Sequence, residues 1–419
     1  MKKILVVFVT VLILLSGCSG KEPAQTALQV WSFTDELEGM IKNYYVPAHP
    51  GVNYVYTFTP SDQFEGRLDP VLSSGQGTPD VFALEAAFVR KYVESGQLLD
   101  LTDLYEVNKQ KLLQYPVDIG SYNGRVYALS WQATPGAMFY RRSLAKKYLG
   151  TDDPATVQTY FADLNKFLET AGLLNERSNG SCVVVASGDG DLYNVFLSSR
   201  NDPWVVDGRL VIDPRLEQYM DVAKLLYERR WEGRVGQWSD GWFAGMRGEL
   251  RDETKALEVF SYFLPTWGLH YVLKTNAPNT SGDWAMIPGP VPYYWGGTWL
   301  GAWKNTRHAD VAKELIRYLT IDDGFLEQWA RDTGDVVSNI AVLNKIKDNY
   351  SEPFLGGQNH YAEFAQMALG VNGRLVQGVN QSLDGTFREA LNTFRFGEKT
   401  KAQALDDFRT TAETFLGLR

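Results

Sequence analysis

The stretch that decides the fold class runs from Ala27 to Leu84: "ALQVWSFTDELEGMIKNYYVPAHPGVNYVYTFTPSDQFEGRLDPVLSSGQGTPDVFAL". It contains three apolar runs that predict strands and two intervening segments that predict helices: 27–31, 52–58 and 80–84, and 36–46 and 62–74. Strands that alternate with helices of about ten residues or more indicate a parallel sheet covered on both faces. We therefore predict an α/β fold that begins with a βαβαβ unit.

The residues just after each predicted strand face the binding crevice of such a sheet. Right-handed crossovers bring the carboxyl ends of parallel strands to one edge, where ligands of open α/β folds bind. Five residues at or near these positions are candidate ligand contacts: Trp31, Phe33, Asp62, Gln63 and Glu85. Glu85 has two interpretations, because a carboxylate there can face the crevice or can stabilise the N-terminus of a helix that starts near Ala86.

A second section with α/β character extends from about Met138 to Pro288. Predicted strands lie in "CVVVAS" and "DWAMIP", and predicted helices lie in "ATVQTYFADLNKFLETAG" and "PRLEQYMDVAKLLYERRW". In the last of these, apolar residues recur three and four positions apart, which is typical of a buried helix face: Leu216, Met220, Ala223, Leu226 and Tyr227. Amphipathic helices also follow in "ADVAKELIRYLT" and "ALDDFRTTAETFL".

Length and composition agree with a folded, two-domain protein. The chain has 419 residues, of which 44% are hydrophobic and 22% charged, and this length predicts two domains. The net charge of −9 argues against a nucleic-acid partner, which would require a basic face. The 12 tryptophans are numerous for this length, and many lie beside Gly, Pro or Asp rather than in helical stripes.

The N-terminus has the pattern of an export signal. "MKKILVVFVTVLILLSGCSG" contains two lysines followed by an apolar run of about a dozen residues, which is too short to span a bilayer. Its end, Leu15 to Cys18, resembles a bacterial lipobox, so we expect a signal peptide over residues 1–17, a lipid on Cys18 and a flexible tether over 18–26. Cys182 is expected to be a small buried hydrophobe, and two cysteines allow no disulfide framework.

Three longer segments carry a family resemblance. "GTPDVFALEAAFVRKYVESGQLLDLTDL", "NGRVYALSWQATPGAMFYRRSLAKKYLG" and "SGDWAMIPGP…GGTWLGAW…HADVAKELIRYLT" occur in this order. Together with the lipobox they resemble the extracellular solute-binding proteins of carbohydrate ABC transporters. The resemblance covers essentially the whole mature chain.

The resemblance implies two α/β lobes, each a sheet flanked by helices, with a ligand cleft between them, as in class II periplasmic binding proteins. Carried over by position, the chain should cross between lobes near 130–135, 284–288 and 336–339. Lobe one would then comprise 27–132 plus 289–335, and lobe two 133–288 plus 336–419. The third crossing, "TGDVVSNIAVL", lacks the Gly-aromatic/Leu-Pro pattern that is usual at this position in the family.

A sugar requires aromatic rings for its apolar faces and polar groups for its hydroxyls. The polar candidates are Asp62, Gln63, Glu85, Gln132 and Asp240. The stacking candidates are Trp31, Phe33, Trp131, Trp204, Trp238, Trp242, Trp267, Trp295 and Trp299. Trp131 is expected to form the floor of the cleft, because it lies on a segment that crosses between the lobes. Trp238 and Trp242, four residues apart, are either a core pair on a helix or binding groups on a glycine-containing loop.

The stretch "PVPYYWGGTWLGAW", residues 290–303, contains rings and glycines together. Its first part, from Tyr294 through Gly297 to Trp299, falls where the resemblance implies a sugar-facing loop. Its second part, from Leu300, is expected to enter a strand and pack in the core. We place the boundary near Trp299.

Catalytic and cofactor sites find no support in the sequence. No pair of carboxylates has a context that would raise one pKa and leave the other exposed, as glycoside hydrolysis requires. The four histidines are scattered, so no metal site is expected, and no dinucleotide or phosphate-binding glycine motif is present. We expect no cofactor and no enzymatic activity.

The expected function is therefore capture of a sugar or oligosaccharide outside the cytoplasm and its delivery to an ABC permease by a lipid-anchored monomer. Closure of the two lobes around the ligand would signal the loaded state. The alternatives are a binding protein for another polar solute, such as a polyol or glycerol-phosphate, and a secreted glycan hydrolase.

Overall fold

The computed structural model describes residues 27–418. The predicted signal peptide, the lipidation site Cys18 and the tether lie outside these residues. Among the helices between residues 27 and 418, none has both the length and the apolar character needed to cross a membrane.

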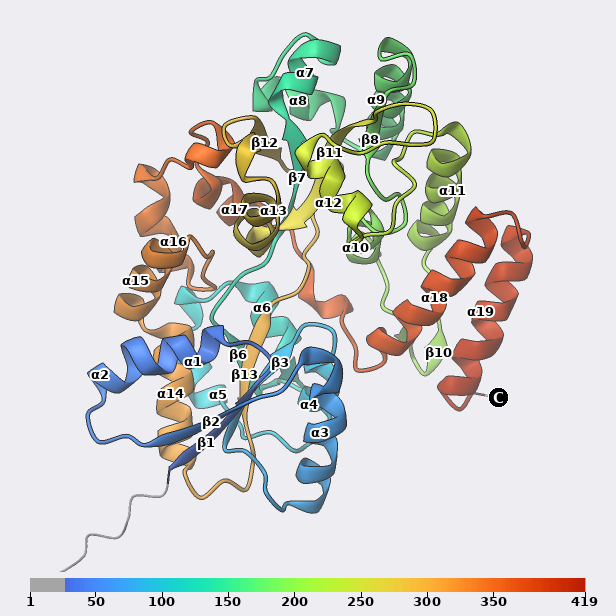
Figure 1. Cartoon of the computed structure of the whole chain (residues 1–419). Coiled ribbons are helices and arrows are strands. Elements are labelled where there is room, and N and C mark those ends of the chain that lie inside the picture. The colour runs from blue at the N-terminus through green and yellow to red at the C-terminus, as the bar shows by residue number, and fades with distance from the viewer. Residues whose placement is uncertain (1–26, 419) are drawn as a thin grey trace, which may run out of the picture.

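The first lobe is built around a five-stranded sheet in the lower half of Figure 1. Its strand order is β2-β1-β3-β13-β6, and the strands are β1 Leu28–Ser32, β2 Tyr54–Phe58, β3 Val81–Glu85, β6 Ala128–Ser130 and β13 Thr298–Ala302. β1 pairs in parallel with β2 and β3, which confirms the predicted βαβαβ unit. β13 lies antiparallel between β3 and β6, although it is distant from both in the sequence.

The second lobe is built around a four-stranded sheet in the upper half of Figure 1. Its order is β12-β7-β11-β8, and the strands are β7 Gly136–Arg141, β8 Cys182–Val185, β11 Glu258–Pro265 and β12 Trp284–Ile287. β11 pairs in parallel with β8 and antiparallel with β7. Two short hairpins complete the strands: β4 Ser121–Tyr122 with β5 Arg125–Val126, and β9 Val205–Val206 with β10 Arg209–Leu210.

Helices cover both sheets, and the two-lobed α/β prediction is confirmed. Between β1 and β6 the helices are α1 Glu36–Met40, η1 Ile41–Tyr45, α2 Val46–Ala48, α3 Ser61–Ser74, α4 Val89–Glu94, α5 Thr102–Glu106, η2 Lys109–Lys111 and α6 Gln114–Ile119. Between β7 and β12 they are α7 Arg142–Leu149, α8 Pro154–Tyr160, α9 Leu164–Arg177, α10 Tyr193–Ser198, α11 Pro214–Arg229, α12 Asp240–Arg247, η3 Gly268–Leu273, α13 Lys274–Asn276 and η4 Pro278–Thr280.

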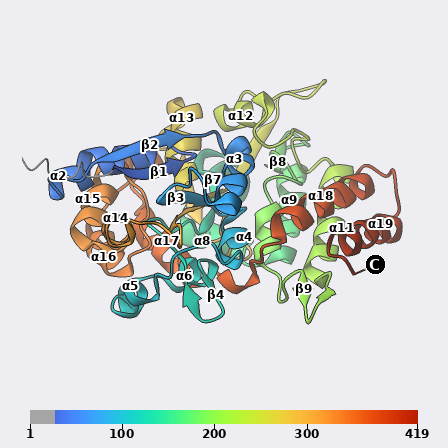
Figure 2. The ribbon, with the colours of Figure 1, turned by 90° about the horizontal axis from the view of Figure 1, so that it is seen from below.

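The helices after β13 divide between the two ends of the molecule. They are α14 Ala309–Ile321, α15 Asp323–Thr333, α16 Ile340–Ile346, η5 Lys347–Asn349, η6 Pro353–Leu355, α17 His360–Ala368, η7 Gly373–Leu375, α18 Asn380–Arg395 and α19 Lys401–Phe415. α14 to α16 lie at one end of the molecule, and α18 and α19 pack beside α11 at the other (Figure 2).

Local sequence signals set the ends of several helices. The Asp213 carboxylate accepts the Arg215 N–H at the start of α11, and Pro214 occupies the first helical position, where its missing N–H is harmless. Thr400 and Gln403 form a capping box at the start of α19. α3 ends at Gly75, whose φ of 68° is left-handed.

Three segments of chain connect the lobes. The first, Trp131–Pro135, runs beside the third, where the Ala133 N–H donates to the Val336 carbonyl (2.7 Å) and the Ser338 N–H to that of Trp131 (2.9 Å). The second was expected at 284–288, and this position is wrong because residues 284–287 form β12 of the second sheet. The chain stays with the second lobe as far as Tyr293, whose hydroxyl donates to the Ala137 and Leu264 carbonyls, and reaches the first sheet at Thr298.

Candidate ligand-binding cleft

A cavity of about 600 Å³ lies where the two lobes meet. Glu85 to Ala87 line it from the first lobe, and Tyr294 to Gly296 line it from the second crossing. The remaining lining residues come from three further segments: 189–200 and 236–238 of the second lobe, and 372–388, which begins against α6 of the first lobe and continues into α18 of the second. Such a volume is typical of small-molecule sites, and a ligand in it would touch both lobes.

Glu85 forms the first-lobe side of the cavity, at the carboxyl end of β3. Its Oε2 accepts the Ala87 N–H at 2.6 Å, and the neighbouring Ala86 N–H donates to the Gly297 carbonyl at 3.0 Å. Burial raises the pKa of Glu85 to about 7, and the backbone N–H groups oppose this rise only in part. The carboxyl group accepts an N–H of the turn before α4, which begins at Val89 and not near Ala86, and Glu85 also lines the cavity, so a ligand contact stays a prediction.

Three indole rings from separate segments meet beside the cavity, and we call them the tryptophan cluster: Trp238, Trp267 and Trp295. Trp238 and Trp267 stack with an angle of 10° between their planes. The Trp267 indole N–H donates to the Trp295 carbonyl at 3.1 Å and holds the crossing against the second lobe. Trp238 is 47% exposed and lines the cavity, so part of its ring remains accessible there.

Gly296 allows the crossing to pass this close to the cluster. Its φ of 71° is left-handed, and a Cβ atom there would lie 2.9 Å from the Trp267 Nε1. The Gly296 carbonyl accepts the Thr134 hydroxyl at 2.8 Å, which ties the first and second crossings together.

The second-lobe wall combines charge with aromatic rings. Arg200 and Asp384 line the cavity near Trp204, whose indole N–H donates to the Asp384 Oδ1 at 2.6 Å. The Arg388 guanidinium lies 4.0 Å from the centre of the Tyr193 ring. Burial raises the pKa of Asp384 to about 6, while the nearby positive charge of Arg200 and the Trp204 hydrogen bond lower it.

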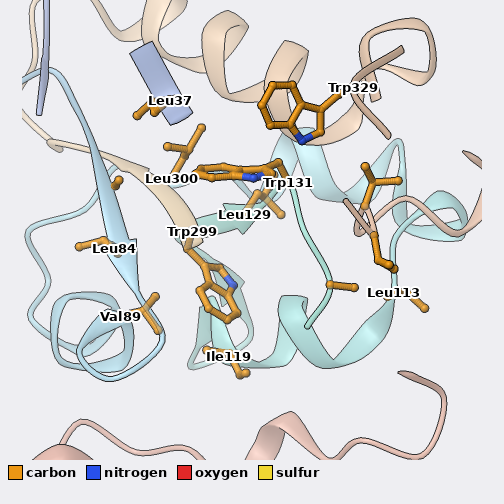
Figure 3. Packing of buried hydrophobic residues seen from close by; sticks show 14 of the residues in the cluster. Leu37, Leu84, Val89, Leu113, Ile119, Leu129, Trp131, Trp299, Leu300 and Trp329 are labelled. Atoms are coloured by element: carbon orange, nitrogen blue, oxygen red, sulfur yellow. The ribbon is translucent and has the colours of Figure 1, made fainter. Parts of the chain in front are cut away.

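Four of the predicted stacking residues are core residues instead. Trp131, Trp204, Trp242 and Trp299 are each at most 1% exposed, so no ring face is available to a ligand. The Trp242 indole donates to Asp191 (2.8 Å) and that of Trp299 to the Pro116 carbonyl (2.8 Å). Figure 3 shows Trp131 and Trp299 packed among Leu129, Ile119 and Leu300. The boundary in "PVPYYWGGTWLGAW" therefore falls at Gly297, before the strand, and not near Trp299.

The other predicted contacts lie outside the lining of the cavity. Trp31 is nearly buried beneath the Arg67 guanidinium, and Phe33 packs edge-on against Phe64 and Phe88. Gln132 is buried and donates to Asp335 at 3.4 Å. Asp62, Gln63 and Asp240 are exposed in the first turns of α3 and α12, and the Gly297 carbonyl accepts the Ala86 N–H.

The prediction missed most of the second-lobe wall. Tyr193 and Asn194 follow β8, so the strand-end rule that identified Glu85 also applied to "SGDGD" and the residues after it. Asp384 and Arg388 gave no such signal, because α18 reaches the cleft only through long-range packing against α11, and Arg200 follows α10 rather than a strand. Among residues 27–418, no group of three or more His, Cys, Asp or Glu side chains could hold a metal ion.

Comparison with known proteins identifies the family. The family model described as bacterial extracellular solute-binding protein matches residues 48–353. The chain belongs to this family. Its members bind solutes outside the cytoplasm and are not enzymes, so the predictions of solute binding, of no enzymatic activity and of an extracytoplasmic location are confirmed.

Relatives and solved structures agree with this assignment. The arabinooligosaccharide-binding protein of Bacillus subtilis (strain 168) is 22% identical over 88% of this chain and 87% of its own length. A crystal structure of an extracellular solute-binding protein of family 1 superposes with a TM-score of 0.81 at 19% identity, covering 93% of this chain and 99% of the other. The binding protein from B. animalis subsp. lactis Bl-04, solved with β-1,6-galactobiose, superposes with a TM-score of 0.71 at 20% identity. This superposition covers 93% of this chain and 97% of the other. At these identities the superpositions establish the fold alone.

Proposed function

We propose that this protein captures a short neutral oligosaccharide between its lobes and delivers it to an ABC importer. The observation that carries the proposal is the composition of the cavity between the lobes, where a partly exposed indole ring lies beside hydrogen-bonding groups from both lobes. Aromatic faces suit the C–H surfaces of sugar rings, and mixed donors and acceptors suit hydroxyl groups. The names of the relatives, which include arabinooligosaccharide-binding and galactobiose-bound proteins, support the same class of ligand.

The charges in the cavity favour a neutral ligand over glycerol-phosphate. Five charged residues line it: Glu85, Asp189, Arg200, Asp384 and Arg388. Asp189 is already paired with Arg395 at 3.0 Å, which leaves two acidic and two basic groups. A phosphate would meet Glu85 and Asp384 as well as the arginines, whereas an uncharged polyhydroxyl ligand can use both signs.

Delivery would depend on hinge closure about the three crossings, because a ligand that touches both lobes stabilises the closed state. We propose that the lobes move as units of 27–132 plus 298–335 and 133–293 plus 336–371 and 379–418, with residues 294–297 and 372–378, which contact the first lobe, as links. The proposal keeps the lipid anchor on Cys18, the monomeric state and the permease partner expected from the sequence.

Ligand screening tests this function. Neutral oligosaccharides, including arabinotriose and β-1,6-galactobiose, should raise the melting temperature and change tryptophan fluorescence, because Trp238 is half exposed in the cleft. A response to polyols or glycerol-phosphate but to no sugar in a broad panel would overturn the sugar assignment. Release of shortened products from the same oligosaccharides would instead support a hydrolase.

A further inference from the structure

Arg200 is buried in an unusual state for an arginine. Its side chain lies in the second-lobe wall with only 5% of the residue exposed, and its Nε donates to the Leu197 carbonyl at 2.9 Å. The guanidinium carbon lies 4.9 Å from the centre of the Trp204 ring. Within residues 27–418, the buried Nη1 has no hydrogen-bond partner, although the residue lines the cavity. An unpaired buried N–H of a charged group is costly, so a small shift of the Arg200 side chain toward the cavity, where a ligand hydroxyl can pair with the guanidinium, would be favourable.

Asp384 provides the complementary group on the same wall. Trp204 fixes it, because the indole that lies beneath Arg200 also donates to the Asp384 Oδ1. The Tyr193 hydroxyl donates to the Asp384 carbonyl oxygen and anchors this turn of α18. No ion pair within 4.0 Å joins Asp384 to Arg200 or Arg388 in the described part of the chain. The second carboxylate oxygen is therefore available to accept a hydrogen bond.

We propose that Arg200 and Asp384 form a specificity-determining pair that recognises two neighbouring hydroxyl groups on one unit of the sugar. One hydroxyl oxygen accepts a hydrogen bond from the Arg200 guanidinium, and the adjacent hydroxyl donates to Asp384. Trp204 acts as a positioning residue, because it contacts both members of the pair, is fully buried and does not line the cavity. This inference rests on the proposed function and adds to it a selectivity for an intact vicinal diol.

The pair has a distinct consequence for selectivity. A site built to bond a hydroxyl group rejects the analogue that lacks it, because its buried polar groups are then left unpaired. Removal of either recognised hydroxyl should weaken binding about 10- to 100-fold, since each bond involves a charged group. An apolar wall would discriminate much less between a sugar and its deoxy analogue.

The test is calorimetric titration of arabinotriose, β-1,6-galactobiose and the monodeoxy derivatives of each into the full mature chain and its variants. The variants are Arg200→Lys and Asp384→Asn, with Arg209→Lys and Asp207→Asn in the exposed β9–β10 hairpin as matched controls. In the wild type and the controls, one or two deoxy positions should show the large penalty. In Asp384→Asn or Arg200→Lys, the penalty at one of these positions should largely disappear. Melting curves verify that each variant is folded.

The outcomes separate the two proposals. Sugar binding with the same deoxy penalties in the wild type and both cleft variants would overturn the Arg200–Asp384 pair and leave the proposed function standing. No binding of any sugar by the wild type would overturn both. If Arg200→Lys fails to fold, the comparison of Asp384→Asn with the wild type still tests the Arg200–Asp384 pair. Asp384→Asn should fold, because Asn can accept the Trp204 hydrogen bond through its amide oxygen.

Discussion

At the scale of single residues, burial separates binding tryptophans from core tryptophans. Trp238 and Trp299 are both flanked by or near glycines in the sequence, yet Trp238 is 47% exposed at the cleft and Trp299 is 1% exposed within a sheet. The Trp299 indole N–H is also satisfied, by the Pro116 carbonyl. Local sequence cannot make this distinction, because it depends on which strand lies alongside.

The two residues should respond in opposite ways to truncation. Trp238→Ala should weaken sugar binding at least tenfold and lower the stability of the ligand-free protein much less than Trp299→Ala, because about half of the ring is exposed. Trp299→Ala should lower the free energy of unfolding by about 3–5 kcal/mol, because it leaves a cavity in the first core. Urea unfolding and calorimetric titration of both variants measure the two effects. Destabilisation by Trp238→Ala as strong as that by Trp299→Ala would show that Trp238 is a core residue.

Glu85 should make the stability of the protein depend on pH. Its folded pKa of about 7 is above the ordinary value for Glu, so the folded state favours the protonated carboxyl group. The stability from this group is therefore fully present below its unfolded pKa and is lost as pH rises through about 7. The melting temperature of the ligand-free protein should fall between pH 5 and pH 8, and Glu85→Gln should reduce this slope. An unchanged slope in Glu85→Gln would contradict the assignment.

At the scale of elements, the second crossing determines the geometry of the cleft. Gly296 has a left-handed φ and lies against Trp267, so the crossing and the tryptophan cluster fit only without a side chain at this position. Gly296→Ala should displace Trp295 and weaken sugar binding, while Gly208→Ala, in the exposed β9–β10 hairpin, introduces the same strain with no change in affinity. Calorimetric titration of both variants provides the comparison, and equal affinities would exclude a role for this close approach.

The elements also show what the sequence could and could not predict. The βαβαβ unit and the strand-end position of Glu85 follow from local periodicity, whereas the loop at Tyr294 to Gly296 is implied by the family resemblance. The identity of the cleft wall does not follow from periodicity, because α18 is joined to the site by packing across nearly two hundred residues of chain. The resemblance to a family located the crossings only approximately, since β12 extends into the expected second crossing.

At the scale of the whole molecule, a hydrogen bond joins the lobes outside the crossings. The Tyr271 hydroxyl, on η3 of the second lobe, donates to the Glu36 Oε1 at the start of α1 in the first lobe (3.0 Å). Burial raises the pKa of Glu36, and the Tyr271 hydrogen bond opposes that rise. This contact favours the arrangement in which the lobes approach each other.

Removing the contact should shift the lobes toward an open arrangement. Tyr271→Phe should increase the radius of gyration of the ligand-free protein in small-angle scattering and weaken ligand binding by several-fold, since closure then costs more free energy. Tyr122→Phe, on the surface of the first lobe, serves as the control. Identical scattering and affinity in Tyr271→Phe and the wild type would show that the contact does not influence closure.

The path of the chain between the sheets has a consequence for how the protein is made. All four strands of the second sheet lie in one continuous stretch that ends at Ile287, whereas β3 and β6 of the first sheet are joined only by β13, Thr298–Ala302. During synthesis the first sheet therefore stays incomplete until the second has been fully translated. Such long-range strand pairing slows folding. The first sheet should therefore be the slower of the two to complete.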